Sequence, residues 1–556
     1  MNRLYTDLME NILSAYTTEH ICRYFDQVKR EGLTEHGFPR LTSNIGILIA
    51  NGRREDLMPL FQEMMTFCCS TIPKVKAAND FSVREIVCCI REIEKSGKVD
   101  AAAIEGWKND LRTIDPRTCY NCFAEAPTDP VRNWALFTGV SEFYRFQMGL
   151  GGSMEFIEIQ IASQLQWLDE NGMYKDNAEG EVHQPMVYDL VARGLFMLLL
   201  QNGYRGKYYE ALDNLLRKTG LLQLKMLSVT GELAFGGRSN QFLHNEAWIA
   251  AICEYEAARY HREGNEKQAG VFKWAAHRAV KNTMYWLDKT PISHVKNRFP
   301  FDTMYGCEAY AYFDKYMITS ASFYYAASMV CDDSIAPIEP EETPFVWQTS
   351  PHFHKIFAKA GGYALEFDTN ADPHYDASGL GRVHRKGAPS PICMSLPCPA
   401  HPNINLFGAE VMAASLCPGI GHEGKLLWSA DEQCAYEVNC RETEGSAVVN
   451  LACSFPEGSV IQTEYTLSAD GIDIVNRGKG KMYYMLPAFD FDGETHTEIT
   501  CGETELAVSY EGWTCRYRTD GKILDSGKTA ANRNGHYRVF YAEGTDQLTV
   551  KIEITK

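Results

Sequence analysis

The sequence predicts a multidomain protein, with a helical N-terminal domain followed by a C-terminal antiparallel β-sandwich. Three observations lead to this fold class. Apolar residues recur at helical spacing from residue 1 to about 335, a proline- and glutamate-rich stretch follows, and from 347 onward apolar and polar residues alternate. We therefore expect a helical domain over 1–335, a linker over 336–346 and a β domain over 347–556. A chain of 556 residues is also longer than one hydrophobic core usually supports.

The helical half is built of amphipathic segments about 12 to 18 residues long that are joined by short loops. Several are apolar on more than one face, which predicts two layers of helices. Antiparallel helix pairs that close into a ring fit this pattern better than a simple four-helix bundle. The first four segments end in glycine, the residue favoured just beyond a helix C-terminus. The segments are 83–97, 156–172, 188–203, 208–220, 247–260, 272–287 and 311–329.

The β half alternates apolar and polar residues in many short segments, so each strand has one face suited to a core. Turn sequences such as Asp470-Gly471 and Asp520-Gly521 separate the segments and favour hairpins. We expect these strands to form a sandwich of antiparallel sheets. The segments are 354–370, 436–441, 446–455, 460–477, 504–518 and 547–556.

Charge and composition exclude several classes of function. The formal net charge of −18 argues against a nucleic-acid partner. There is no apolar run long enough to span a membrane and no export signal at the N-terminus, so we expect a cytoplasmic protein that does not bind membranes. The 18 cysteines are scattered, which favours free thiols. Cys119 and Cys122 have zinc-like spacing, but no second pair follows, so neither a metal nor another cofactor is indicated.

The first candidate site cluster is the stretch Gly237–Trp248. Asn240, His244 and Trp248 are spaced i, i+4, i+8, so we expect them to share one face of a helix, next to Arg238. Such a stripe predicts the wall of a pocket that holds a polar, anionic group. The alternative is structural: a core histidine, a capping asparagine and a packed tryptophan.

The second cluster, His374–Ser390, concentrates positive charge in an acidic chain. Arg382 and His384 lie two residues apart and are expected to share one face of a strand. The nearby Gly379 and Gly381 lack the sequence context of a nucleotide-binding loop. The alternative interpretation is a solvated, charged turn.

The third cluster, Lys296–Tyr316, is rich in tyrosine and includes Tyr305, Glu308, Tyr310 and Tyr312. A phenol beside an arginine or lysine can have its pKa lowered enough to move protons, and Tyr310 or Tyr312 is expected to do so. The alternative is that the rings pack and their hydroxyls reach the surface.

A fourth, weaker group lies at residues that begin or interrupt helices. Its members are expected to point into the hollow of the helical ring, and they are Asn133, Trp134, His183 and Tyr188.

The domain order and the residue types in these clusters together resemble the heparinase II/III-like polysaccharide lyases. The resemblance covers nearly the whole chain but includes no long diagnostic motif. It implies an incomplete (α/α) toroid, a β-sandwich, and a cleft between them that holds a uronic acid. It also implies β-elimination, in which the C5 proton of a uronate is removed and an unsaturated product forms. With no export signal, a short oligosaccharide attacked from its end is the expected substrate, for instance a rhamnose-glucuronate oligosaccharide.

The resemblance assigns roles that elimination chemistry requires. Asn240, His244 and Asn133 are expected to neutralise the uronate carboxylate as enolate character develops. Proton transfer falls to Tyr310 or Tyr312 and to His384, with His183 in reserve. Arg238 and Arg382 are expected to bind substrate anions, and Trp134 or Trp248 to stack on a sugar ring. The expected binding set also includes Tyr188, Tyr305 and Glu308.

Three other functions remain open from the sequence. A glycoside hydrolase of the toroid type needs two carboxylates across the cleft, and Glu246, Glu308 and Asp376 adjoin the clusters. A uronate C5-epimerase uses similar proton chemistry without cleavage, and a glycan-binding protein would form no product. The sequence leaves open whether the protein forms a homo-oligomer.

Overall fold

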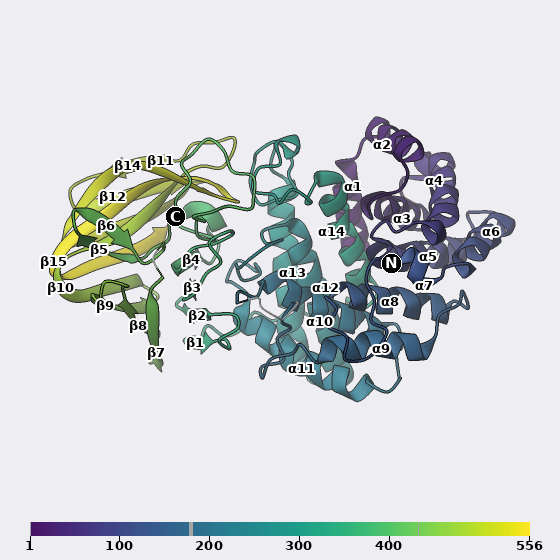
Figure 1. The fold of residues 1–556 in the computed structure, drawn as a ribbon, viewed down its shortest axis with the longest axis horizontal. Coiled ribbons are helices and arrows are strands. Elements are labelled where there is room, and N and C mark those ends of the chain that lie inside the picture. The colour runs from purple at the N-terminus through teal and green to yellow at the C-terminus, as the bar shows by residue number, and fades with distance from the viewer. Residues whose placement is uncertain (1, 177–181, 432) are drawn as a thin grey trace.

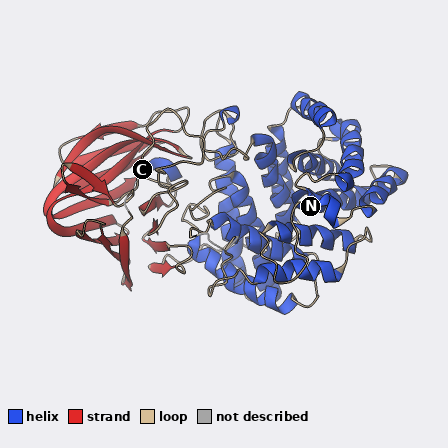
Figure 2. Cartoon of the chain, viewed as in Figure 1, coloured by secondary structure: helices blue, strands red, loops and turns tan. Residues whose placement is uncertain are grey.

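The computed structural model describes residues 2–176, 182–431 and 433–556. It confirms the predicted fold class, because helices fill the N-terminal part and antiparallel strands fill the C-terminal part (Figure 2). The helices that build the N-terminal part are α1 (Arg3–Ser14), α2 (Thr18–Glu31), α3 (Gly37–Ala50), α4 (Met58–Thr71), α5 (Asn79–Ser96), α6 (Ala101–Arg112), α7 (Pro116–Cys119), α8 (Trp134–Gln147), α9 (Met154–Leu165), α10 (Met186–Gln201), α11 (Tyr209–Met226), α12 (Leu243–Arg262), α13 (Glu266–Leu287) and α14 (Phe313–Ser328).

Six of these helices form a closed inner ring. Around the ring α3 contacts α5, α5 contacts α8, α8 contacts α10, α10 contacts α12, α12 contacts α14, and α14 returns to α3. The helices α1, α4, α9, α11 and α13 pack on the outside of this ring. Helices α3, α10, α12 and α14 are buried along most of their length, which explains why their sequences are apolar on more than one face. The predicted two-layer toroid is therefore present.

Local sequence sets several helix ends. Side chains of Asn2, Thr17, Asp100 and Ser153 accept hydrogen bonds from backbone N–H groups in the first turn of the helices they precede. At Gly97, which has a positive φ of 65°, α5 ends as predicted.

The predicted helix end at Gly220 is wrong, because α11 continues to Met226. A Cβ atom at Gly220 would lie 3.2 Å from Cγ of Glu256 on α12. This glycine therefore permits close packing of two helices and does not end one.

The β domain consists of two antiparallel sheets. The small sheet has the order β1-β2-β3-β4, and the large sheet contains the run β11-β12-β13-β15-β10-β9-β8-β7, with β14 paired to β15 and the β5–β6 hairpin to β10. The strands are β1 (Phe345–Gln348), β2 (Lys355–Ala360), β3 (Tyr363–Asp368), β4 (Gly379–Arg385), β5 (Pro418–His422), β6 (Lys425–Trp428), β7 (Ala435–Thr443), β8 (Ser446–Ser454), β9 (Val460–Ser468), β10 (Gly471–Phe491), β11 (Glu498–Cys501), β12 (Glu505–Tyr510), β13 (Trp513–Thr519), β14 (Lys522–Asn532) and β15 (Gly535–Thr555).

The small sheet lies between the toroid and the large sheet (Figure 1). One face shares a core with the large sheet, where Phe367 of β3 packs against Tyr465 of β9. On the toroid side, Phe357 of β2 belongs to a second cluster with Met186 and Met226, which lie on α10 and α11. The β domain is therefore fixed against one side of the toroid by apolar contacts.

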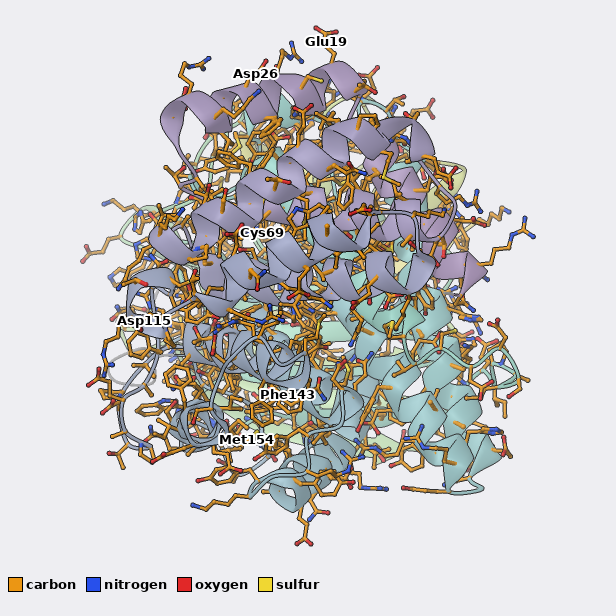
Figure 3. The ribbon with its side chains drawn as sticks, turned by 90° about the vertical axis from the view of Figure 1, so that its right-hand side faces the viewer. Glu19, Asp26, Cys69, Asp115, Phe143 and Met154 are labelled. Carbon is orange, nitrogen blue, oxygen red and sulfur yellow. The ribbon has the colours of Figure 1, made fainter. Side chains whose placement is uncertain are left out.

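Figure 3 shows the side of the toroid that faces away from the β domain, and Glu19 and Asp26 of α2 point outward there. Cys69 of α4 lies in the interior and is fully buried. Among the described residues, no helix is both long enough and apolar enough to span a lipid bilayer.

Candidate active site

A pocket of about 930 Å³ lies inside the helical ring. All six inner helices contribute side chains to it, and so does the loop 235–241, which precedes α12. The pocket is large enough for a sugar unit, since small-molecule sites usually measure about 300–1,000 Å³. It lies in the toroid, whereas the resemblance implies a cleft between toroid and sandwich.

The structure brings seven of the predicted site residues together in this pocket. They come from three of the four sequence clusters and are Asn133, Trp134, Tyr188, Arg238, His244, Trp248 and Tyr310. The expectation that the fourth group points into the ring is therefore met by Asn133, Trp134 and Tyr188. Trp134 is half-buried at the rim, with the Arg132 guanidinium 5.3 Å from its ring. Trp248 is fully buried and stacks on Phe323, so it supports the wall and presents no open face to a sugar ring.

The second cluster lies outside the pocket. Arg382 and His384 do share strand β4, but both side chains are buried between the domains. Arg382 forms an ion pair with Glu366 at 3.0 Å. His384 bonds to Ser228 through Nδ1 and to Ser395 through Nε2, each at 2.6 Å. The positive charge in this strand neutralises a buried carboxylate, so neither the substrate-binding role of Arg382 nor the catalytic role of His384 is supported.

The predicted helical stripe is wrong at Asn240, because α12 begins at Leu243. Asn240 lies in the preceding loop, and its amide donates to the backbone oxygen of Ala234 at 2.9 Å. Only His244 and Trp248 share the helix face. Asn240 therefore holds the loop in shape and does not line the pocket.

Four more predicted residues are absent from the lining of the pocket. Tyr312 is exposed, and Tyr305 is buried in a stack on Phe299. His183 lies at a separate small cavity next to His354. Glu308 is buried behind the loop 235–241, where it acts on that loop.

Sequence reasoning missed several residues that line the pocket. His36 and Arg40 come from the start of α3, and Lys315 and Tyr316 come from the start of α14. These two helices are neighbours only because the ring closes. No local sequence pattern indicates that these residues share a pocket, because about 275 residues separate the two helix starts along the chain.

The loop 235–241 holds unusual backbone conformations. Besides Gly236 and Gly237, Ser239 and Gln241 have positive φ values of 59° and 65°. Such conformations cost free energy in non-glycine residues and persist only where the surroundings fix them. They place Arg238 and Ser239 at the pocket.

Three buried carboxylates fix this loop. The N–H groups of Phe235, Gly237 and Ser239 donate to Glu366 at 3.2 Å, Asp376 at 2.7 Å and Glu308 at 2.6 Å. Glu366 and Asp376 belong to the β domain. Glu308 belongs to the toroid but pairs with Arg533 of the β domain. The β domain therefore shapes the active-site loop from behind.

A row of hydroxyl groups crosses the pocket. The Ser239 hydroxyl lies 2.9 Å from the Tyr310 hydroxyl and 3.4 Å from the Tyr188 hydroxyl. Tyr316 adds a third phenol, with its ring 6.1 Å from that of Tyr310. Linked hydroxyls can pass protons along a chain.

Asn245 fixes the tautomer of His244. The Asn245 amide nitrogen donates to the Ser239 backbone oxygen at 3.4 Å and lies 3.2 Å from Nε2 of His244. Nε2 therefore accepts a hydrogen bond, and the neutral ring carries its proton on Nδ1. Nδ1 has no hydrogen-bond partner among the described residues. It is a buried donor available to a ligand.

Positive charge exceeds negative charge at the inner end of the pocket. Arg40 and Arg84 share one carboxylate, that of Glu85, at 3.0 and 2.7 Å, and all three side chains are buried. No other carboxylate in the described part of the chain pairs with either guanidinium. The remaining excess charge favours an anion beside Arg40.

The two carboxylates that line the pocket are already engaged. Asp176 pairs with Arg238 at 2.7 Å and accepts a hydrogen bond from the Asn133 amide at 2.6 Å. Glu35 pairs with Lys315 at 2.9 Å. Neither adds free negative charge to the pocket.

The environment moves the pKa values of imidazoles and phenols in opposite directions. Burial, with Arg40 nearby, lowers the pKa of His244 to about 3 and that of His36 well below its usual value. Burial also raises the pKa values of Tyr188, Tyr310 and Tyr316. The expectation of a lowered tyrosine pKa is therefore wrong, because desolvation outweighs the neighbouring cations. The pocket therefore holds unprotonated imidazoles and protonated phenols.

Asp376 makes the stability of the protein depend on pH. Burial raises the pKa of Asp376 from 3.8 to about 7. The folded state therefore holds an extra proton between these values, and its stability is expected to fall as the pH rises from 4 through 7. Asp376→Asn keeps an oxygen acceptor for Gly237 and should flatten this fall, as measured by melting temperature from pH 4 to 8. Equal slopes in both proteins would contradict the assignment.

Comparison with known proteins gives matches in three-dimensional structure only. No family model and no curated protein matches the chain. A heparinase III, the BT4657 gene product, matches with a TM-score of 0.46 at 10% identity, over 93% of this chain and 78% of that one. A mutant heparan sulfate lyase HepC from Pedobacter heparinus matches with a TM-score of 0.34 at 9% identity, over 89% and 75% of the chains.

A GH127 β-L-arabinofuranosidase from Geobacillus stearothermophilus T6 matches with a TM-score of 0.33 at 10% identity, over 98% and 91% of the chains. By name, these similar structures include both lyases and a glycosidase. With every one of these TM-scores below 0.5, the chemistry of this chain has to be inferred from its own pocket.

Proposed function

We propose that this protein is a lyase that cleaves uronate-containing oligosaccharides by β-elimination in the pocket of the toroid. One observation carries the proposal. The pocket combines excess positive charge for a carboxylate with unprotonated imidazoles and protonated phenols. Elimination next to a uronate needs these three elements, namely neutralisation of the carboxylate, a base for the C5 proton and an acid for the leaving oxygen.

The uronate carboxylate binds at the inner end of the pocket. Arg40 supplies the excess positive charge there, and Nδ1–H of His244 supplies a buried donor that has no partner among the described residues. Both interactions strengthen as enolate charge builds on the carboxylate in the transition state. Binding of an anion also raises the pKa values of nearby imidazoles, because it favours their protonated form.

Proton transfer uses groups on the same walls. His36 lines the pocket, and its Nδ1 has no hydrogen-bond partner among the described residues, so we assign it as the base for the C5 proton. Tyr310 donates a proton to the oxygen that leaves C4. The Ser239 and Tyr188 hydroxyls extend the path along which this proton can be replaced.

The hydrolase alternative lacks its expected pair of carboxylates. Glu246 pairs with buried Lys296 at 2.6 Å, and Glu308 pairs with Arg533. Asp376 accepts the Gly237 N–H group. These three candidates do not line the pocket, and the two carboxylates that do, Asp176 and Glu35, are each paired with a cation, which favours elimination over hydrolysis.

Product absorbance tests the proposal. The protein is incubated with a panel of short uronate oligosaccharides, and near-ultraviolet absorbance is followed together with new reducing ends. We expect both to rise together, because elimination leaves a double bond conjugated to the carboxylate. Reducing ends without absorbance would show hydrolysis. Exchange of the C5 proton with deuterated solvent without cleavage would show epimerisation.

A further inference from the structure

A second cavity, of about 150 Å³, lies between the toroid and the small sheet. Its walls come from Leu224 at the end of α11, from Val271 and Trp274 of α13, and from Tyr363 of β3. The linker segment 339–343 closes one side. The cavity does not share a lining residue with the active-site pocket.

Lys359 of β2 is the unusual residue in this cavity. Its ammonium group donates to the backbone oxygen of Leu224 at 3.1 Å, which is its one side-chain hydrogen bond within the described residues. An ammonium group has three donors, and no carboxylate in the described part of the chain pairs with it. The residue is half-buried, and desolvation of its ammonium group without a counter-charge lowers the pKa of Lys359 to about 7.

The other charged groups at the cavity already have partners. Glu339 and Glu342 pair with Lys386 at 2.6 and 2.8 Å, and Glu341 pairs with Lys267 at 2.9 Å. The Ser228 hydroxyl bonds to His384, which is neutral at physiological pH because burial lowers its pKa to about 3.

The Tyr363 hydroxyl, at the same cavity, bonds to the backbone of Ile554. Lys359 is therefore left with donors to offer a ligand.

We propose that this cavity binds a small carboxylate with an apolar body, held by an ion pair to Lys359 and by contact with Trp274. A dry cavity of roughly this volume accommodates a benzene-sized body. The ligand would contact the toroid, the linker and the small sheet at once. Binding is therefore expected to stabilise the arrangement of the two domains, independently of the reaction in the toroid.

Isothermal titration calorimetry of the full chain with benzoate tests this site. We expect one site, and Lys359→Met should weaken benzoate binding about 10- to 100-fold, because a hydrogen-bonded ion pair is lost. Benzyl alcohol, which lacks the charge, should bind weakly and equally to both proteins. At pH 8 benzoate binding should take up a proton in the wild type, seen as a dependence of the heat on the buffer, and not in Lys359→Met.

Two further variants keep the test decisive. Val271→Trp fills the cavity and should abolish benzoate binding. Lys481→Met removes an ion pair with Glu543, neither of whose residues lines the cavity, and should leave binding unchanged. Absence of benzoate binding to the wild type, or equal binding to wild type and Lys359→Met, would overturn the proposal. The latter result would place benzoate elsewhere, for instance at the cations of the active-site pocket.

Discussion

Replacing Tyr310 by phenylalanine is expected to lower kcat by about 10²- to 10⁴-fold, the usual contribution of a general acid. The change removes one hydroxyl, which lies 2.9 Å from that of Ser239 in the pocket. KM should change little, because the carboxylate is held by Arg40 and His244. The measurement is the initial rate of near-ultraviolet absorbance on the oligosaccharide found active in the panel.

Tyr312→Phe is the matched control for this experiment. Tyr312 is two residues away but exposed and outside the pocket, so its loss should leave kcat unchanged. Melting temperatures of both variants should stay close to that of the wild type, since one neutral hydrogen bond contributes about 1 kcal/mol. If Tyr310→Phe retains full kcat, or if Tyr312→Phe loses as much, the acid has been assigned to the wrong residue.

Local periodicity was sufficient to predict the fold class. Helices and strands differ in the spacing of apolar residues along the chain, so the change near residue 335 could be read directly. Where a residue type at one position could serve two different structural roles, the sequence could not distinguish between these roles. Gly220 looked like a helix end but permits the approach of Glu256 across two helices.

The candidate site was predictable where its residues are close in sequence. His244 and Trp248 face the pocket because both lie on α12. His36 and Arg40 could not be found in this way, since ring closure brings them from the other end of the domain. Arg382 and His384 were predicted as site residues because of their charge, yet they bind buried groups at the domain interface. Charge alone does not distinguish a ligand site from a buried ion pair.

Breaking the ion pair between Arg533 and Glu308 is expected to have the largest effect on stability. Both side chains are buried, and the guanidinium binds the carboxylate through two nitrogens at 2.6 and 3.1 Å. Arg533→Met leaves the Glu308 charge buried without its partner, which should lower the free energy of unfolding by about 3–5 kcal/mol. The matched control, Arg538→Met, breaks an exposed pair with Asp525 and should lower it by less than about 1 kcal/mol. Urea unfolding measures the free energy of unfolding of both variants.

The same ion pair connects stability to activity. Glu308 accepts a hydrogen bond from the Ser239 N–H group at 2.6 Å. By fixing Glu308, Arg533 therefore also fixes the strained loop that contains Arg238 and Ser239. Arg533→Met should therefore lower kcat even where the protein remains folded, although Arg533 does not line the pocket. The double variant Arg533→Met/Glu308→Leu should regain part of the stability, because no charge is left unpaired, but not the activity, because the Ser239 N–H group has lost its acceptor. If the double variant loses as much stability as the two single variants lose together, the two side chains act independently.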